Sequence, residues 1–143
     1  MERYCAYQER CHKEVRQKLF EMRLNPESCD QIISDLIQSN FLNESRFAMA
    51  FARGKFRAKK WGKRRIVNEL KFREISHYNV QLALKEIPDS EYYETFDALA
   101  KKRFQQLASE KNLLRKKRKF RDYLVYRGWE NELIYDKMTQ LFK

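Results

Sequence analysis

The sequence predicts an all-α protein, and three observations support this prediction. Apolar side chains recur at spacings of three and four residues along most of the chain, which gathers them on one face of a helix. Alternation of apolar and polar residues, the pattern of a half-buried strand, is scarce. Only three Gly and two Pro occur among 143 residues, too few to supply the turns of an all-β fold.

Two helices are predicted before residue 40. We expect the first to run from residue 3 to about residue 22, with Tyr4, Cys11, Val15, Leu19 and Met22 near one face. Asn25 and Pro26 then form a start signal, because Asn caps helix N-termini and Pro fits the first helical position. The helix that they open carries Cys29, Ile32, Ile33, Leu36 and Ile37 on one face.

The middle of the chain continues in the same way. Asn43 is expected to cap a helix with an apolar or small face formed by Phe47, Ala50, Phe51 and Gly54. A basic helix follows, packed through Ile66, Val67 and Leu70. Ser76 is expected to cap the next helix, whose apolar positions are Val80, Ala83, Leu84 and Ile87.

Pro88-Asp89-Ser90 is the clearest boundary in the chain. The helix after it is expected to end near Ala108, and either Ser109 or Asn112 can cap its successor. Gly128 ends that helix. A final amphipathic helix carries Leu133, Ile134, Met138 and Leu141.

A short apolar pattern occurs three times. Ile32, Ile33, Leu36 and Phe41 match Ile66, Val67, Leu70 and Ile75, and these in turn match Phe120, Arg121, Leu124 and Trp129. In each case a large apolar residue follows the leucine of a helix by five positions, before a new helix begins. The repetition predicts an elongated, curved array of helical units that bury their open faces against each other. The alternative is coincidence among helical hairpins.

Positive charge is concentrated in one segment. The net charge is +11, and residues 53–73 contain ten basic residues but a single acid, Glu69. The basic residues are Arg53, Lys55, Arg57, Lys59, Lys60, Lys63, Arg64, Arg65, Lys71 and Arg73. Such a surface indicates a polyanionic partner, with nucleic acid first, an acidic protein second and an anionic membrane third. Solvent exposure of a cationic helix face, without a partner, is the simpler interpretation.

A second basic cluster comprises Arg115, Lys116, Lys117, Arg118 and Lys119, in the first two turns of a predicted helix. Positive charge there opposes the helix dipole, so the placement favours a functional reason over a purely structural one. Lys and Arg dominate both clusters, which predicts contact with phosphates and no reading of base sequence. Trp61 is the best candidate to stack on a base, although aromatic residues at helical spacing are more often part of the core.

Enzymatic chemistry is not expected. His12 and His77 are far apart, without neighbouring Cys or His, and the chain lacks a nucleophile motif or a phosphate loop. We therefore predict no catalytic residue, no metal site and no cofactor. The three cysteines are expected to be ordinary buried thiols in a reducing compartment. Met1 leads directly into a charged helix, and no apolar run approaches the ~20 residues of a membrane span, so we expect a cytoplasmic location.

Four motifs are spread in order over the whole chain. The central one is Gly62-x-x-Arg65-Ile66-x-x-Glu69-Leu70-x-x-Arg73-x-Ile75. The others are Arg3-Tyr4-Cys5-Ala6-x-Gln8-Glu9-Arg10-Cys11, Asn40-Phe41-Leu42-x-Glu44-x-Arg46-Phe47-Ala48 and Leu124-x-x-Arg127-Gly128-Trp129. Together they resemble the RecX family of bacterial regulators of the RecA recombinase. The chain departs from the family pattern at Lys63, where Pro is frequent, and at Glu74, where Gly is common.

The resemblance implies three tandem three-helix repeats, which we place at residues 1–52, 53–88 and 89–143. It also implies a non-enzymatic negative regulator that binds the groove of the RecA–single-stranded DNA filament. Such proteins suppress the ATPase, strand-exchange and co-protease activities of RecA, and they bind DNA directly. We expect single-stranded and also double-stranded DNA as ligands, no membrane, and a monomer.

The site predicted for DNA or filament binding combines both basic clusters with Trp61. Its members are Arg53, Lys55, Arg57, Lys59, Lys60, Trp61, Lys63, Arg64, Arg65, Lys71, Arg73, Arg115, Lys116, Lys117, Arg118 and Lys119. One alternative is a general nucleic-acid-coating protein without a recombinase partner. Another is a helical adaptor whose basic face meets an acidic protein.

Overall fold

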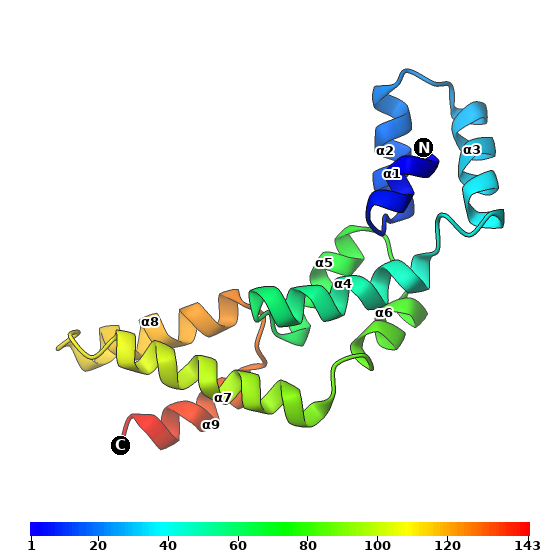
Figure 1. Ribbon diagram of the computed structural model, residues 1–143. Helices are drawn as coiled ribbons and strands as arrows, with labels where there is room; N and C mark the ends of the chain where they lie inside the picture. Colours follow the sequence, from blue (N-terminus) through cyan, green and yellow to red (C-terminus); the bar gives the residue numbers. More distant parts are fainter. The chain divides into compact units, whose positions relative to one another are not determined.

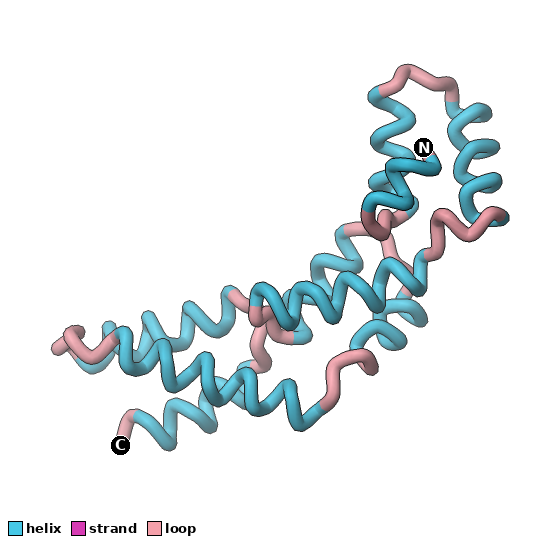
Figure 2. The backbone as a smooth tube through the Cα atoms, in the orientation of Figure 1, coloured by secondary structure: helices cyan, strands magenta, loops and turns pink.

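Nine α-helices joined by short loops make up the computed structural model, which describes residues 1–143 (Figures 1 and 2). They are α1 (Glu2–Tyr7), α2 (His12–Glu21), α3 (Pro26–Gln38), α4 (Glu44–Lys59), α5 (Lys63–Phe72), α6 (His77–Leu84), α7 (Asp89–Gln106), α8 (Leu113–Tyr126) and α9 (Asn131–Leu141). No strand is present, so the all-α prediction is confirmed. None of the helices combines the length and the apolar character needed to cross a membrane.

The prediction of one continuous helix from residue 3 to about residue 22 is wrong, because this segment forms two helices, α1 and α2. Gln8 is extended, with φ −158° and ψ 162°, and Cys11 begins a new helix by forming a capping box with Glu14. Arg10 stabilises the break. Its Nε donates to the carbonyl of Tyr4 at 3.0 Å, and its guanidinium lies 3.8 Å from the centre of the Tyr4 ring. Apolar periodicity alone did not reveal this break, since Tyr4, Cys11 and Val15 still fall near one face.

Side-chain caps fix the start of four helices where the sequence predicted them. The amide oxygens of Asn25 and Asn43 accept from backbone N–H groups at 2.8 and 2.9 Å, and the hydroxyl of Ser76 accepts at 3.3 Å. Asn112, the second of the two candidates before α8, accepts from the N–H of Arg115 at 3.0 Å. Each cap satisfies a donor that a helix N-terminus leaves unpaired.

The repeated apolar pattern has a backbone cause at the C-termini of α2, α3, α5 and α8. Each helix ends in a left-handed residue, Arg23, Asn40, Glu74 or Gly128, with φ between 61° and 91°. The next residue then returns its N–H to the carbonyl of the leucine that lies five positions before it. The bonds are Leu24 to Leu19, Phe41 to Leu36, Ile75 to Leu70 and Trp129 to Leu124. This Schellman geometry places a large apolar side chain five positions after the leucine.

The helices form three tandem repeats of three helices, and their order pairs α2 with α5 and α8. Val15, Leu19 and Leu24 therefore correspond to Ile66, Leu70 and Ile75 in the second repeat. The sequence match that began at Ile32 instead compared the third helix of the first repeat with the second helices of the other two. All four C-termini share one cap, which is why the pattern fitted both registers. The predicted boundaries after residues 52 and 88 stay predictions.

Two compact units contain the hydrophobic core. Unit 1 comprises Met1–Ala52 and Glu69–Glu86, and unit 2 comprises Arg53–Asn68 and Ile87–Lys143. Within unit 1, α1, α2 and α3 bury a cluster formed by Cys5, Val15, Leu19, Cys29, Ile33, Leu36 and Leu42. Within unit 2, α7, α8 and α9 pack on one another around Phe96, Phe120, Leu124, Trp129 and Ile134.

Candidate nucleic-acid interface

The loop between α4 and α5 packs against the loop between α8 and α9, both within unit 2. The N–H of Gly62 donates to the carbonyl of Arg127 at 2.8 Å, and the N–H of Arg64 donates to the carbonyl of Gly128 at 3.0 Å. The two glycines permit this approach. A Cβ on Gly62 would lie 2.4 Å from the Gly128 oxygen, and one on Gly128 would lie 2.2 Å from the Cβ of Arg65.

Two side chains from the second loop complete the C-terminus of α4. A terminal guanidinium nitrogen of Arg127 donates to the carbonyl of Lys59 at 2.9 Å. The indole N–H of Trp129 donates to the carbonyl of Lys60 at 3.2 Å. These carbonyls have no partner within α4, so the third repeat supplies the hydrogen bonds that the helix end lacks. The basic segment is thus held in one backbone conformation.

Tyr92 on α7 joins the start of α5 to the same loop. Its hydroxyl accepts from the N–H of Lys63 at 2.8 Å and donates to the carboxylate of Glu130. Its ring centre lies 4.6 Å from that of Trp129, within the range of favourable aromatic pairs. Burial, followed by the hydrogen bond to Glu130, raises the pKa of Tyr92 well above its ordinary value. The phenol therefore stays protonated and acts as a structural link.

Arg65 contacts two aromatic rings. Its guanidinium carbon is 4.2 Å from the centre of the Trp61 ring and 4.7 Å from that of Tyr126. One of its terminal nitrogens donates to the carbonyl of Tyr126 at 3.2 Å. Lys55 also approaches Trp61, with its Nζ 5.3 Å from the ring centre. Trp61 is half-buried and already contacts two cations, so a base that stacked on it would have to displace one of them.

The remaining predicted cations of unit 2 differ in how far they are neutralised. Arg57 faces Glu91 at 3.6 Å and Lys63 faces Asp89 at 3.7 Å, with both carboxylates at the start of α7. Lys60 donates to the carbonyl of Arg57 at 3.0 Å. The side chains of Lys59 and Arg64 are exposed and form no ion pair. Arg53, near the middle of α4, is half-buried.

Lys71 and Arg73 lie in unit 1 and differ in how far their side chains are free to contact a ligand. Arg73 bonds the carboxylate of Glu69 at 2.8 Å, and its guanidinium lies 4.7 Å from the centre of the Phe51 ring. Its binding capacity is therefore largely used within the fold. Lys71 is exposed and without an ion pair. Glu69 and Arg73 are four residues apart on a helix, a spacing that predicts this ion pair from the sequence.

The second cluster occupies the first two turns of α8. Lys119 pairs with Glu110 at 2.9 Å, and this contact lowers the pKa of the Glu110 carboxyl. The Nζ of Lys116 lies 4.5 Å from the centre of the Phe104 ring. Arg115, Lys117 and Arg118 form no ion pair. Leu113 and Leu114, which precede them, are 56% and 76% exposed, a feature that the apolar spacing of the sequence does not indicate.

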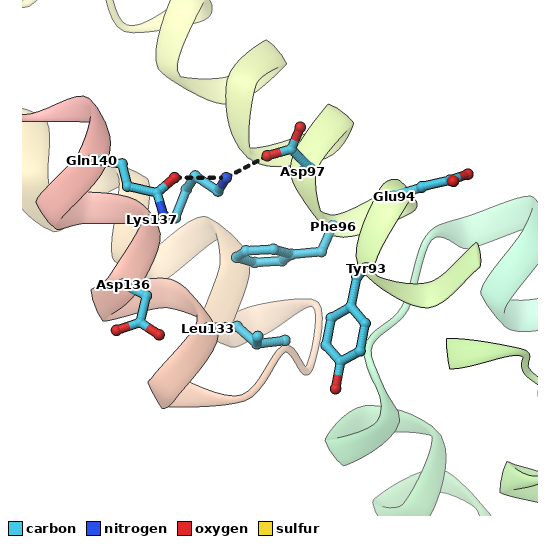
Figure 3. Close-up of a pocket in the computed structure, with 8 residues that line it drawn as sticks. All are labelled: Tyr93, Glu94, Phe96, Asp97, Leu133, Asp136, Lys137 and Gln140. Atoms are coloured by element: carbon cyan, nitrogen blue, oxygen red, sulfur yellow. Dashed lines mark hydrogen bonds and ion pairs between the residues drawn. The ribbon is translucent and has the colours of Figure 1, made fainter. Parts of the chain in front are cut away.

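A groove of about 460 Å³ between α7 and α9 lies apart from these cations (Figure 3). Figure 3 shows Phe96 and Leu133 lining it and Lys137 bridging Asp97 and Gln140 at one side. None of the residues predicted to bind DNA lines it. Phe96 packs on Trp129 at 5.2 Å between ring centres, so the groove borders the core that supports the basic loop.

The structure brings together no cluster of side chains suited to binding a metal ion or to thiol chemistry. No group of three or more His, Cys, Asp or Glu side chains comes together in a way that could hold a metal ion. Cys5, Cys11 and Cys29 are free and buried. Burial raises the pKa of the Cys11 thiol to about 11, which keeps it protonated near neutral pH and unreactive as a nucleophile.

Residues 43–84 match the family model for the second three-helix domain of RecX, which covers α4, α5 and α6. A regulatory protein RecX from Lactobacillus johnsonii is 33% identical over 91 residues, 64% of this chain and 34% of that protein. Another from Clostridium acetobutylicum is 30% identical over 133 residues, 91% of this chain and 61% of that protein. The chain thus spans between about a third and three fifths of the length of these relatives.

The crystal structure of RecX from Lactobacillus salivarius has the same fold. It superposes with a TM-score of 0.80 over 97% of this chain and 90% of that chain, at 24% sequence identity. At this identity the likeness is one of fold. The sequence matches include the basic segment and extend over nine tenths of the chain. With the repeats and the Gly62–Gly128 contact in place, these matches show that the chain is similar to regulatory proteins RecX over most of its length.

Proposed function

We propose that this protein is a non-enzymatic negative regulator of the RecA recombinase. It binds in the groove of the RecA–single-stranded DNA filament and inhibits the ATPase, strand-exchange and co-protease activities. It acts as a monomer in the cytoplasm, where these filaments form during DNA repair, and also binds single-stranded and double-stranded DNA directly. Similarity to the RecX family supports the recombinase partner, since the relatives are named as regulatory proteins RecX.

One observation carries the DNA-binding part of the proposal. The α4–α5 loop and the helix ends beside it carry several cations on a backbone that hydrogen bonds hold in place. Three of these cations, Lys59, Arg64 and Arg65, have no carboxylate partner. Unpaired cations at fixed spacing favour the phosphates of a nucleic acid, because each contact releases counterions from the polyanion. A flexible basic tail would attract the same ligand but would not define a register along it.

The second cluster is proposed as an additional contact. Arg115, Lys117 and Arg118 extend from α8 beside the exposed Leu113 and Leu114. Apolar side chains gain nothing from phosphate, so this mixed surface is better suited to the protein component of a filament than to DNA alone. The α4–α5 loop would then face the DNA while the start of α8 contacts recombinase.

The experiment compares affinities for the filament and for bare DNA. The labelled 143-residue chain is titrated with oligodeoxythymidine, with and without saturating RecA and a slowly hydrolysed ATP analogue. The proposal predicts tighter binding to the filament by at least about tenfold, or ~1.4 kcal/mol. Equal affinities would favour the alternative of a general coating protein. Binding to recombinase that survives nuclease treatment unchanged would favour an adaptor that recognises acidic protein surface.

A further inference from the structure

The guanidinium of Arg65 contacts one aromatic ring from each of two distant parts of the chain. Trp61 lies in the α4–α5 loop, four residues before Arg65, whereas Tyr126 is the last residue of α8. Gly62 and Arg64, which lie between Trp61 and Arg65 in the sequence, form the backbone hydrogen bonds to Arg127 and Gly128. The position of this guanidinium is therefore set by contacts within unit 2.

The donors of Arg65 are mostly unused. A guanidinium carries five N–H groups, and the structure commits one nitrogen, through its bond to the carbonyl of Tyr126. No carboxylate pairs with Arg65. Aromatic rings cover the faces of a guanidinium and leave its edges free to donate. Arg73, by contrast, pairs with the carboxylate of Glu69.

The chemistry of this free edge is specific. Two parallel N–H groups match two oxygens of a phosphate, and such bidentate, charge-assisted contacts are stronger than single ones. Arginine is also more weakly hydrated than lysine, so it loses less when it is partly buried. Lys59 and Arg64, exposed on the same segment, add charge without a fixed plane.

We propose that Arg65 is a preoriented phosphate-binding group for the backbone of single-stranded DNA, and that Trp61 and Tyr126 are positioning residues that hold its plane. This inference rests on the proposed function, because it names the group with which the same surface meets DNA. It assigns Trp61 a role different from base stacking. It also adds Tyr126, which is 74% exposed and was not among the residues predicted from the sequence.

A structural role for Arg65 gives a different expectation. If the stacked arginine only joined the two loops, its replacement would lower the stability of unit 2 and leave DNA affinity unchanged in the folded protein. The proposal predicts the reverse for Arg65→Lys, which keeps the charge but loses the planar fork. Tyr126→Leu keeps every charge and removes one wall of the stack at an exposed position, so it tests positioning without a buried cavity.

The chain offers a matched control in Arg10. Its guanidinium also lies over a tyrosine, 3.8 Å from the Tyr4 ring centre, and also donates to the carbonyl of that tyrosine. Unlike Arg65, it faces a carboxylate, Glu14, at 3.6 Å. Arg10→Lys therefore makes the same chemical change at an arginine that is already paired.

The test measures the affinity of the full chain for oligodeoxythymidine by fluorescence anisotropy at several salt concentrations, with thermal unfolding of each variant. We expect Arg65→Lys to weaken binding about tenfold and Tyr126→Leu about threefold, while Arg10→Lys stays within about twofold of the parent. Equal affinity of Arg65→Lys, Tyr126→Leu and the parent would overturn the inference and leave the proposed function standing. If the parent binds neither DNA nor filament, both fail. If Arg65→Lys does not fold, the DNA affinity of Tyr126→Leu alone tests the inference.

Discussion

Gly62 and Gly128, 66 positions apart in the sequence, meet so closely that a methyl group on Gly62 would lie 2.4 Å from the carbonyl oxygen of Gly128. Their contact lets the loop after α4 dock on the loop after α8, and the basic segment takes its conformation from this docking. The stability of unit 2 and the geometry of the proposed interface are therefore coupled.

Gly62→Ala should destabilise the protein by about 1–3 kcal/mol, because the added methyl group must displace backbone. Gly54→Ala is the matched control. Gly54 is exposed within α4, and a methyl group there would meet no other atom within 4 Å, so the same change should stabilise by about 0.5–1 kcal/mol through helix propensity. Urea unfolding measures both. Equal effects of the two substitutions would contradict the described docking.

Glu74→Gly should stabilise the protein by about 1 kcal/mol. Glu74 ends α5 with φ 61°, a left-handed conformation that costs a residue with a Cβ about 1–2 kcal/mol, and its side chain is exposed. The greater freedom of Gly in the unfolded chain offsets part of this gain. The midpoint of urea unfolding should rise. A lower midpoint would mean that the left-handed cap at this position is not present.

Lys59→Ala combined with Arg64→Ala should flatten the salt dependence of single-stranded DNA binding. Each lost phosphate contact lowers the log–log slope by about 0.7, so the pair predicts a decrease of about 1.4. Both side chains are exposed and without ion pairs, so the fold should be retained. Arg16→Ala with Lys18→Ala, two exposed cations of α2 in unit 1, removes the same charge and should leave the slope unchanged. A slope that does not change in the first double variant would argue for protein contacts at these positions.

Replacing Lys63, Arg64 and Arg65 together by Glu should abolish filament inhibition. The structure shows that this triple variant also breaks contacts of Lys63 with Asp89 and of Arg65 with Trp61 and Tyr126. Circular dichroism and thermal unfolding must therefore accompany the inhibition assay. A folded triple variant that still inhibits would remove the α4–α5 loop from the proposed site.

Asp97→Asn should reduce stability at neutral pH and have a smaller effect in acid. Hydrogen bonds from Lys137 and Lys101 lower the pKa of the Asp97 carboxyl in the folded state. The stabilisation is therefore complete above the unfolded pKa of about 3.9 and is lost as the pH falls through the lower folded value. The side chain is 39% exposed, so solvent screening limits the effect to a fraction of a kcal/mol. Urea midpoints of parent and variant should converge as the pH falls through the lowered folded pKa of Asp97; a constant difference would contradict the ion pair.

Local signals in the sequence predicted much of the fold. Asn25, Asn43 and Ser76 cap helices as expected, because a cap depends only on residues a few positions away. The break before Cys11 was missed, since it depends on Arg10 folding back over Tyr4 while the apolar spacing continues through it. The repeat register was ambiguous because α2 and α3 end in the same cap.

The candidate site was only partly predictable. Charge counting located the basic segment, since clustered cations are visible in any linear sequence. Which of them are free depends on tertiary contacts, such as Lys63 with Asp89 and Arg65 with Tyr126. A contact across 61 positions has no local signature, so Tyr126 could not be inferred. Family resemblance pointed to Arg127-Gly128-Trp129 without indicating that this loop supports the cations.

The central claim is regulation of the recombinase filament, and RecA ATPase activity on single-stranded DNA tests it most directly. The protein is added at substoichiometric ratios after the filament has formed. We predict that the rate of ATP hydrolysis falls already at ratios well below one protein per recombinase, because one bound regulator acts on a cooperative filament. If hydrolysis is unaffected until the protein saturates the free DNA, the protein is a basic DNA-coating protein, and the proposed regulation is contradicted.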